Sequence, residues 1–256
     1  MLTIYACQID IVWENKPANF ARVTELVAGA GIVPGGLIVL PEMFATGFSM
    51  NADAIAEDAQ TGETAFFLAD LARRCGCHVL AGVVTASNGG TRPHNEALVF
   101  GPDGALIGGY AKQRPFTPSG EKDNYDAGDR PVVVVINGVR VAPLICYDLR
   151  FPELFRAALT LGVDAFVVIA SWPIARIAHW SALLRARAIE NQSYVVGVNR
   201  VGTDPTPLIY PGASVVFDPS GALIAQAASG ETILTTELNA DFAAQYRADL
   251  PFLADR

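Results

Sequence analysis

The sequence predicts an α/β protein in which two mixed β-sheets face each other with helices on the outside. Short apolar runs typical of buried strands alternate with amphipathic helical patterns. Hairpin turns such as Asn137-Gly138 interrupt that alternation, so antiparallel strands must join parallel ones. The strands also outnumber those that one doubly wound sheet usually holds. With 256 residues, 51% of them hydrophobic, the chain can bury one large core, and we predict a single domain over residues 1–256.

The N-terminal part supplies a strand, a helix and a second strand. Leu2–Gln8 reads as the first strand, and a helix opens at Pro17, with its apolar residues at helical spacing. Leu37–Leu40 is a short, continuous apolar strand that leads directly to Glu42. Glu42 is therefore expected at the C-terminal end of a buried strand, where a carboxylate can accept and return a proton.

A helix, a strand and a hairpin follow. Thr61–Arg74 has the apolar spacing of a helix, and His78–Val84 that of a strand. Glu96–Phe100 and Ala105–Tyr110 flank a Gly-Pro-Asp-Gly turn, so these two strands are predicted to be antiparallel.

A loop of about twenty residues, Ala111–Arg130, comes next and shows no periodic pattern. Loops of that length inside compact domains are usually functional. It opens with Lys112, a cation that could lower the pKa of a nearby thiol or hold an oxyanion.

The strongest single signal is a cysteine at a corner between a strand and a helix. The strand Val139–Ile145 ends at Cys146, and Pro152 stands where the helix Pro152–Leu161 begins. Such a corner holds a side chain rigidly at the C-terminal edge of a sheet and leaves backbone N–H groups free. Cys146 is therefore the candidate nucleophile.

The remaining elements continue the pattern of buried strands and one long helix. A loop reading SWPIARIAHW lies between the strand predicted at Ala165–Ala170 and the helix predicted at His179–Asn191. Besides a strand at Val132–Ile136, the predictions are a strand at Ala165–Ala170, a helix at His179–Asn191, and strands at Tyr194–Asn199, Ala213–Phe217, Ala222–Ala227 and Thr232–Leu238.

Composition excludes several classes of function. A net charge of -8 disfavours nucleic acid and anionic membrane surfaces as partners, because both need clustered Lys and Arg. No run approaches the roughly 18 apolar residues of a membrane span, and the N-terminus lacks a leader pattern, so a cytoplasmic protein is expected. Four cysteines and three histidines give no zinc spacing and no disulfide framework, and we expect no metal.

Three segments in order, LPEMFATGF, YAKQRPF and ICYDLRFPEL, resemble the catalytic signatures of the nitrilase superfamily of carbon-nitrogen hydrolases. The resemblance extends over nearly the whole chain, including AHWSALLRARAIENQSYVVGVNR and the DPSGALIA turn. Within the superfamily the chain looks most like the omega-amidase branch. The resemblance implies a four-layer αββα sandwich, a homodimer formed through the outer helices, and no cofactor.

The resemblance also implies a site and a reaction. The Glu-Lys-Cys triad of the family falls on Glu42, Lys112 and Cys146, and Glu121 stands where the family often has a second glutamate. The backbone N–H of Tyr147 would join Lys112 in holding the oxyanion. The implied reaction releases ammonia from a small omega-amide of a dicarboxylic (2-oxo) acid through a cysteine thioester.

Substrate-binding residues are predicted from the residues near the strand ends. The aromatic candidates for the pocket are Phe44, Phe116 and Trp172. A remote substrate carboxylate needs a cation, and Arg150 is expected to be paired with Asp148 and Glu153. Arg176, in the loop after Ala165–Ala170, is therefore the predicted carboxylate-binding residue.

Other functions remain open from the sequence. The same triad could hydrolyse a nitrile or an N-carbamoyl amine, although Cys-Tyr-Asp followed by Arg-Phe-Pro-Glu favours the amidase branch over nitrilases with Cys-Trp-Glu. A catalytically silent binding protein on the same fold would have no reason to keep all three triad residues. A thiol redox protein would need a resolving cysteine at a suitable spacing, and the sequence offers none.

Overall fold

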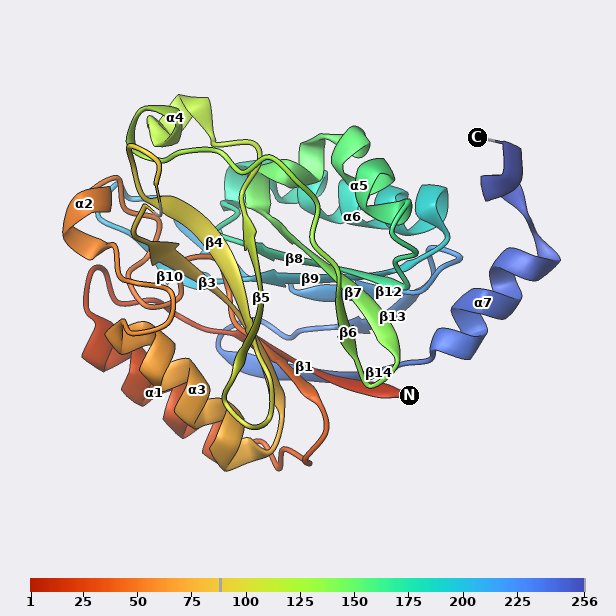
Figure 1. Ribbon diagram of the computed structural model, residues 1–256, viewed down its shortest axis with the longest axis horizontal. Helices are drawn as coiled ribbons and strands as arrows, with labels where there is room; N and C mark the ends of the chain where they lie inside the picture. The colour runs from red at the N-terminus through yellow and green to blue at the C-terminus, as the bar shows by residue number, and fades with distance from the viewer. Residues whose placement is uncertain (88, 256) are drawn as a thin grey trace.

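The computed structural model forms a four-layer αββα sandwich, which confirms the predicted fold class (Figure 1). It describes residues 1–87 and 89–255. Asn88 and Arg256, which belong to the predicted domain 1–256, lie outside the described residues. No helix in the described part of the chain is long and apolar enough to cross a membrane.

The first sheet is mixed and has the order β14-β1-β2-β3-β4-β5. Its three central strands β1, β2 and β3 are parallel, and the other three add antiparallel neighbours. The bounds are β1 Leu2–Gln8, β2 Leu37–Val39, β3 His78–Thr85, β4 His94–Phe100, β5 Leu106–Ala111 and β14 Thr232–Leu238.

The second sheet repeats this design with the order β13-β12-β9-β8-β7-β6. Here β7, β8 and β9 are parallel, and β6, β12 and β13 are antiparallel to their neighbours. The bounds are β6 Val134–Ile136, β7 Val139–Ile145, β8 Ala165–Ala170, β9 Tyr194–Asn199, β12 Val215–Phe217 and β13 Leu223–Gln226. A separate two-stranded ribbon consists of β10 Val201–Thr203 and β11 Ile209–Pro211.

Helices cover the outer faces of both sheets (Figure 1). On the first sheet lie α1 Lys16–Ala28 and α3 Glu63–Cys75, and on the second lie α5 Pro152–Leu159 and α6 Ile177–Asn191. The C-terminal helix α7, Ala240–Asp249, lies at one edge of the molecule. Two short helices, α2 Ala52–Ile55 and α4 Glu121–Asn124, interrupt loops.

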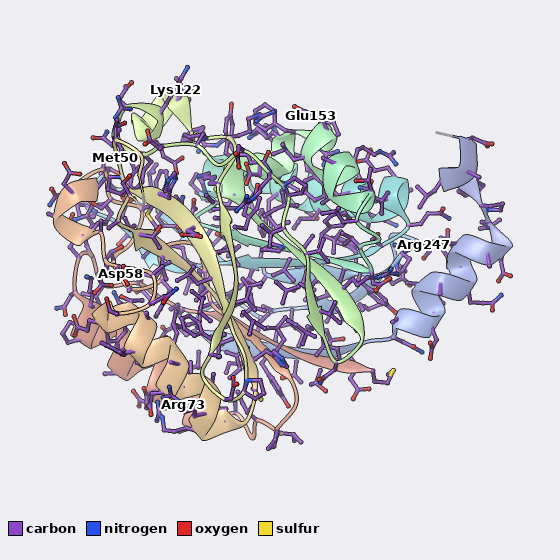
Figure 2. All side chains as sticks on the ribbon, in the orientation of Figure 1. Met50, Asp58, Arg73, Lys122, Glu153 and Arg247 are labelled. Atoms are coloured by element: carbon purple, nitrogen blue, oxygen red, sulfur yellow. The ribbon has the colours of Figure 1, made fainter. Side chains whose placement is uncertain are left out.

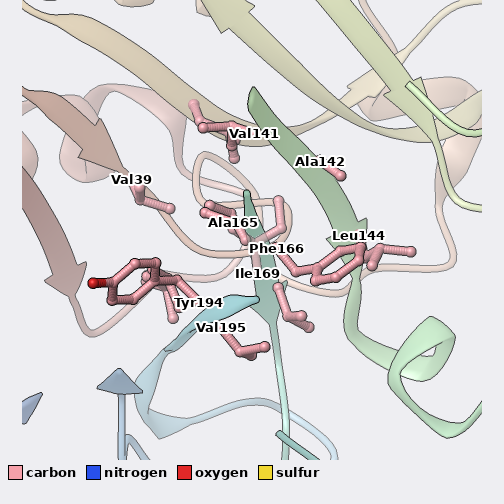
Figure 3. Packing of buried hydrophobic residues seen from close by; sticks show 14 of the residues in the cluster. Val39, Val141, Ala142, Leu144, Ala165, Phe166, Ile169, Tyr194 and Val195 are labelled. Atoms are coloured by element: carbon pink, nitrogen blue, oxygen red, sulfur yellow. The ribbon is translucent and has the colours of Figure 1, made fainter. Parts of the chain in front are cut away.

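The main core lies between the sheets. Val39 of the first sheet belongs to the same buried cluster as Val141, Phe166 and Val195 of the second (Figure 3). These strands are apolar on both faces because each is covered by the other sheet and by helices, as expected for buried parallel strands. The packing brings the C-terminal ends of β2 and β7 to one edge, where the site residues emerge.

The structure corrects several predicted boundaries. The helix predicted from His179 begins at Ile177, directly after a 3-10 turn. The segment Ala111–Arg130 is not structureless, because it contains a 3-10 turn at Thr117–Ser119 and the helix α4. Helices of three or four residues are too short to produce a hydrophobic period, which explains why the sequence did not reveal them.

Candidate active site

Glu42, Lys112 and Glu121 form a buried cluster of two acids and one lysine, here called the acid-lysine cluster. The Nζ atom of Lys112 lies 2.9 Å from Oε1 of Glu42, and 3.0 and 2.8 Å from the two carboxylate oxygens of Glu121. None of the three is more than 1% exposed. Figure 2 shows the neighbouring Lys122 pointing outward from α4. Glu121, on the same short helix, is wholly buried.

Further donors satisfy the two carboxylates. The side-chain amide of Asn95 donates to Glu42 and to Glu121, at 2.8 Å each. The backbone N–H of Ser171 donates to the other oxygen of Glu42 at 2.8 Å, and the N–H of Phe116 donates to Glu121. Asn95 and Ser171 were not predicted as site residues. The only signal for Asn95 was its position just before a predicted strand.

The charge of Lys112 is stabilised by its neighbours. Burial by itself lowers the pKa of a lysine, but the carboxylates of Glu121 and Glu42 outweigh that effect and raise the pKa of Lys112 above its ordinary value. The ammonium group also lies 5.1 Å from the centre of the Phe48 ring. Lys112 therefore contributes a positive charge that is held in one position inside the site.

Cys146 follows β7 directly and begins a 3-10 turn, Cys146–Arg150, here called the nucleophile turn. Its φ of 46° lies in the left-handed region that non-glycine residues rarely adopt, and such strain is common at functional sites. Burial, and then the charge of Glu42, raise the pKa of the thiol well above its usual value, although Lys112 acts in the opposite direction. The resting sulfur is thus a thiol, and its attack on a substrate requires a base.

A cavity of about 550 Å³ opens above the thiol. Its size falls within the range of small-molecule sites. Of the predicted residues, Cys146, Tyr147, Phe116, Trp172 and Arg176 line it.

The structure contradicts the prediction that Phe44 lines this pocket. Phe44 is wholly buried, and its ring centre lies 6.1 Å from the centres of Phe20 and Phe67. It belongs to the core between the first sheet and its helices. The sequence placed it at a strand end but could not show which side of the strand end its ring would face.

The expected pairing of Arg150 with Asp148 and Glu153 is also wrong. No ion pair joins Arg150 to either acid among the residues that the structure describes. Instead the guanidinium centre lies 4.9 Å from the ring centre of Trp172, and Nη2 donates to His179 at 3.3 Å. Arg150 lines the pocket, so the expected ion pairing no longer excludes it as the cation that binds the substrate carboxylate.

The αββα sandwich carries a pocket lined by a thiol beside an acid-lysine cluster, an arrangement that suits hydrolysis through a cysteine nucleophile. The model of the family described as carbon-nitrogen hydrolase matches residues 3–248. The chain belongs to the carbon-nitrogen hydrolase family, as its three signature segments indicated.

Two relatives and one solved structure are similar to this chain over almost its whole length. The chain is 37% identical over 257 residues to Omega-amidase YafV of Escherichia coli (strain K12), covering 99% of this chain and 96% of the relative. It is 32% identical over 255 residues to the 2-oxoglutaramate amidase of Bacillus subtilis (strain 168), with the same coverage. The crystal structure of XC1258 from Xanthomonas campestris, a CN-hydrolase superfamily protein, aligns with a TM-score of 0.92 and 35% identity, covering 100% of this chain and 97% of that one. These relatives support an amidase of the omega-amidase-like branch.

Proposed function

We propose that this protein hydrolyses the terminal amide of a small dicarboxylic acid monoamide, including 2-oxo acids, and releases ammonia. One observation carries the proposal. The pocket is lined by the half-buried thiol of Cys146 and by two arginines, Arg150 and Arg176. Such a pocket suits a substrate with an amide at one end and a carboxylate at the other. The relatives named omega-amidase and 2-oxoglutaramate amidase support the same substrate class.

In the proposed mechanism Glu42 is the base. It takes the thiol proton as the sulfur of Cys146 attacks the amide carbon, and the carbonyl oxygen becomes an oxyanion held by Lys112 and the backbone N–H of Tyr147. Glu42 then gives the proton to the departing nitrogen, which leaves as ammonia. Water, activated by Glu42, attacks the resulting thioester, releases the acid and restores the thiol.

Glu121 is proposed as the second acid of the site. Its two oxygens contact Lys112 at 3.0 and 2.8 Å, so it keeps the lysine charged and fixed while Glu42 gains and loses its proton. Without Glu121, protonation of Glu42 would leave Lys112 as a buried charge with no partner.

Arg176 is proposed to bind the remote carboxylate. Its guanidinium centre lies 5.4 Å from the ring centre of Phe116, in the pocket wall. Arg176→Ala should lower kcat/KM about 10- to 100-fold for a dicarboxylate monoamide, and little for a neutral aliphatic amide of the same length. If Arg150→Ala shows this selectivity and Arg176→Ala does not, the carboxylate belongs to Arg150.

The substrate class is tested by ammonia release from a matched set of compounds. The set holds the monoamides of four- and five-carbon dicarboxylic acids, with and without a 2-oxo group, and the nitrile and N-carbamoyl amine of similar length. The proposal expects the largest kcat/KM among the monoamides. Faster hydrolysis of the nitrile or the N-carbamoyl compound would transfer the function to that alternative, and binding without turnover of any compound would favour a silent binding protein.

Three further expectations stand as proposals. We propose that residues 1–256 act as one domain and that two chains pair through their outer helices. Exposed apolar side chains such as Ile189 of α6, 50% exposed, support such pairing. A molecular mass equal to that of a single chain in analytical ultracentrifugation would contradict this pairing.

A cytoplasmic location is supported by the four free cysteines, which suit a reducing compartment, and cell fractionation tests this location.

A further inference from the structure

Asp148 is a wholly buried carboxylate in the nucleophile turn, two residues after Cys146. The proposed mechanism gives it no role. Within residues 1–87 and 89–255, no lysine or arginine side chain lies within ion-pair distance of it. A buried acid without a cation partner is costly to keep ionised, so its hydrogen bonds need an explanation.

Three donors converge on Asp148 from both halves of the site. One carboxylate oxygen accepts the backbone N–H of Ile145 at 3.0 Å and the hydroxyl of Tyr110 at 2.8 Å. The other oxygen accepts the backbone N–H of Arg114 at 2.9 Å. Ile145 directly precedes the nucleophile. Tyr110 and Arg114 lie two residues before and two residues after Lys112, so one carboxylate ties the lysine segment to the cysteine segment.

The ionised form suits this arrangement because a carboxylate only accepts hydrogen bonds. A protonated acid could donate its O–H only to the hydroxyl of Tyr110, which would then have to turn its own hydrogen away, because both backbone partners can only donate. We propose that Asp148, as a carboxylate, is the positioning residue that holds Cys146 and Lys112 in place relative to each other. Its protonation loosens this placement and lowers kcat/KM. The inference rests on the proposed roles of Cys146 and Lys112.

The surroundings of Asp148 set the pH at which this change occurs. Burial raises the pKa of Asp148 to about 7, while Lys112, the two backbone N–H groups and Tyr110 act in the opposite direction. On the side of α6, the buried Arg187 donates to the carbonyl of Leu149 in the same turn. Activity should therefore decline as the pH decreases through about 7.

The test is the pH profile of kcat/KM for amide hydrolysis in wild type, Tyr110→Phe and Asp148→Asn. Tyr110→Phe removes one hydrogen bond to the ionised form of Asp148. The decrease of kcat/KM at acid pH, the acid limb of the profile, should therefore move to higher pH by about one unit. Asp148→Asn should lower kcat/KM at high pH about a hundredfold, through misplacement of the nucleophile, and should abolish the limb. If Asp148→Asn does not fold, Tyr110→Phe still decides the question.

Asp164→Asn is the matched control. Asp164 is also buried, but it pairs with Arg140 before the start of β8, at the opposite end of that strand from Ser171. Its variant should keep the wild-type profile. An acid limb that stays in place in either Tyr110→Phe or Asp148→Asn would overturn the inference and assign the titration to another group.

A stability measurement separates positioning from unfolding. Because the pKa of Asp148 is raised in the folded protein, protonating it favours the folded state. Activity lost between about pH 8 and about pH 6 should therefore occur without a lower Tm. A Tm that decreases in parallel with activity would contradict the inference. Amide hydrolysis by Cys146→Ala would instead contradict the proposed function itself.

Discussion

Glu42 has both carboxylate oxygens engaged, one by Lys112 and Asn95 and the other by the N–H of Ser171. Glu42→Gln keeps the shape of the side chain but cannot accept the thiol proton. Since the pKa of Cys146 is raised, the thiol does not ionise on its own, and we expect acylation to become at least a hundredfold slower. Rapid quenching and mass spectrometry measure this step. Acylation at the wild-type rate would move the base to another residue, with Glu121 next.

Lys112 is expected to matter for stability as well as for the proposed chemistry, because its ammonium group lies between two buried carboxylates. Lys112→Met leaves these carboxylates without a cation. We expect it to abolish turnover and to lower the free energy of unfolding by about 3–5 kcal/mol. Urea denaturation followed by circular dichroism measures the loss.

A second substitution shows whether that loss is electrostatic. Adding Glu121→Gln to Lys112→Met removes one of the two uncompensated charges, so part of the stability should return. Strictly additive losses in the double variant would mean that the two side chains do not interact energetically.

At the scale of elements, the site depends on the close approach of β3 to the segment after β2. A Cβ added at Gly82 of β3 would lie 2.5 Å from Cα of Glu42 and 2.7 Å from N of Met43. Gly82→Ala must therefore displace the backbone that carries Glu42. We expect kcat/KM to decrease about a hundredfold, measured as ammonia release.

Gly138, in the turn between β6 and β7, provides the control for this prediction. An added Cβ there meets nothing within 4 Å, but the residue has a φ of 81°. Gly138→Ala should cost about 1 kcal/mol of stability and leave kcat/KM close to that of wild type. Equal effects of the two glycine variants on kcat/KM would contradict the proposed importance of the approach at Gly82.

The sequence predicted the elements with clear periods and missed those set by tertiary contacts. The strand that ends at Ile145 was predicted with its observed end, because the apolar run, Cys146 and Pro152 all mark that corner. The short α4 was missed, although Glu121 on it contacts Lys112. Its inward orientation depends on hydrogen bonds to residues far along the chain, such as Asn95.

At the scale of the whole molecule, the sandwich joins two similar sheets so that β2 and β7 end at one edge. The three signature segments predicted that Glu42, Lys112 and Cys146 lie near one another at this edge, because the resemblance covered nearly the whole chain. Pocket residues were harder to predict. Phe44 and Arg150 differ from expectation because ring packing and cation-ring contacts depend on neighbours that the sequence does not specify.

The central claim is that the amide carbonyl becomes a thioester on Cys146. The direct measurement is mass spectrometry of the protein quenched in acid during turnover of a dicarboxylic acid monoamide. The account predicts an added mass equal to the acyl group less the thiol hydrogen, located on the peptide that contains Cys146 and absent from Cys146→Ala. Turnover with no acyl adduct on Cys146, or ammonia release by Cys146→Ala at the wild-type rate, would contradict it.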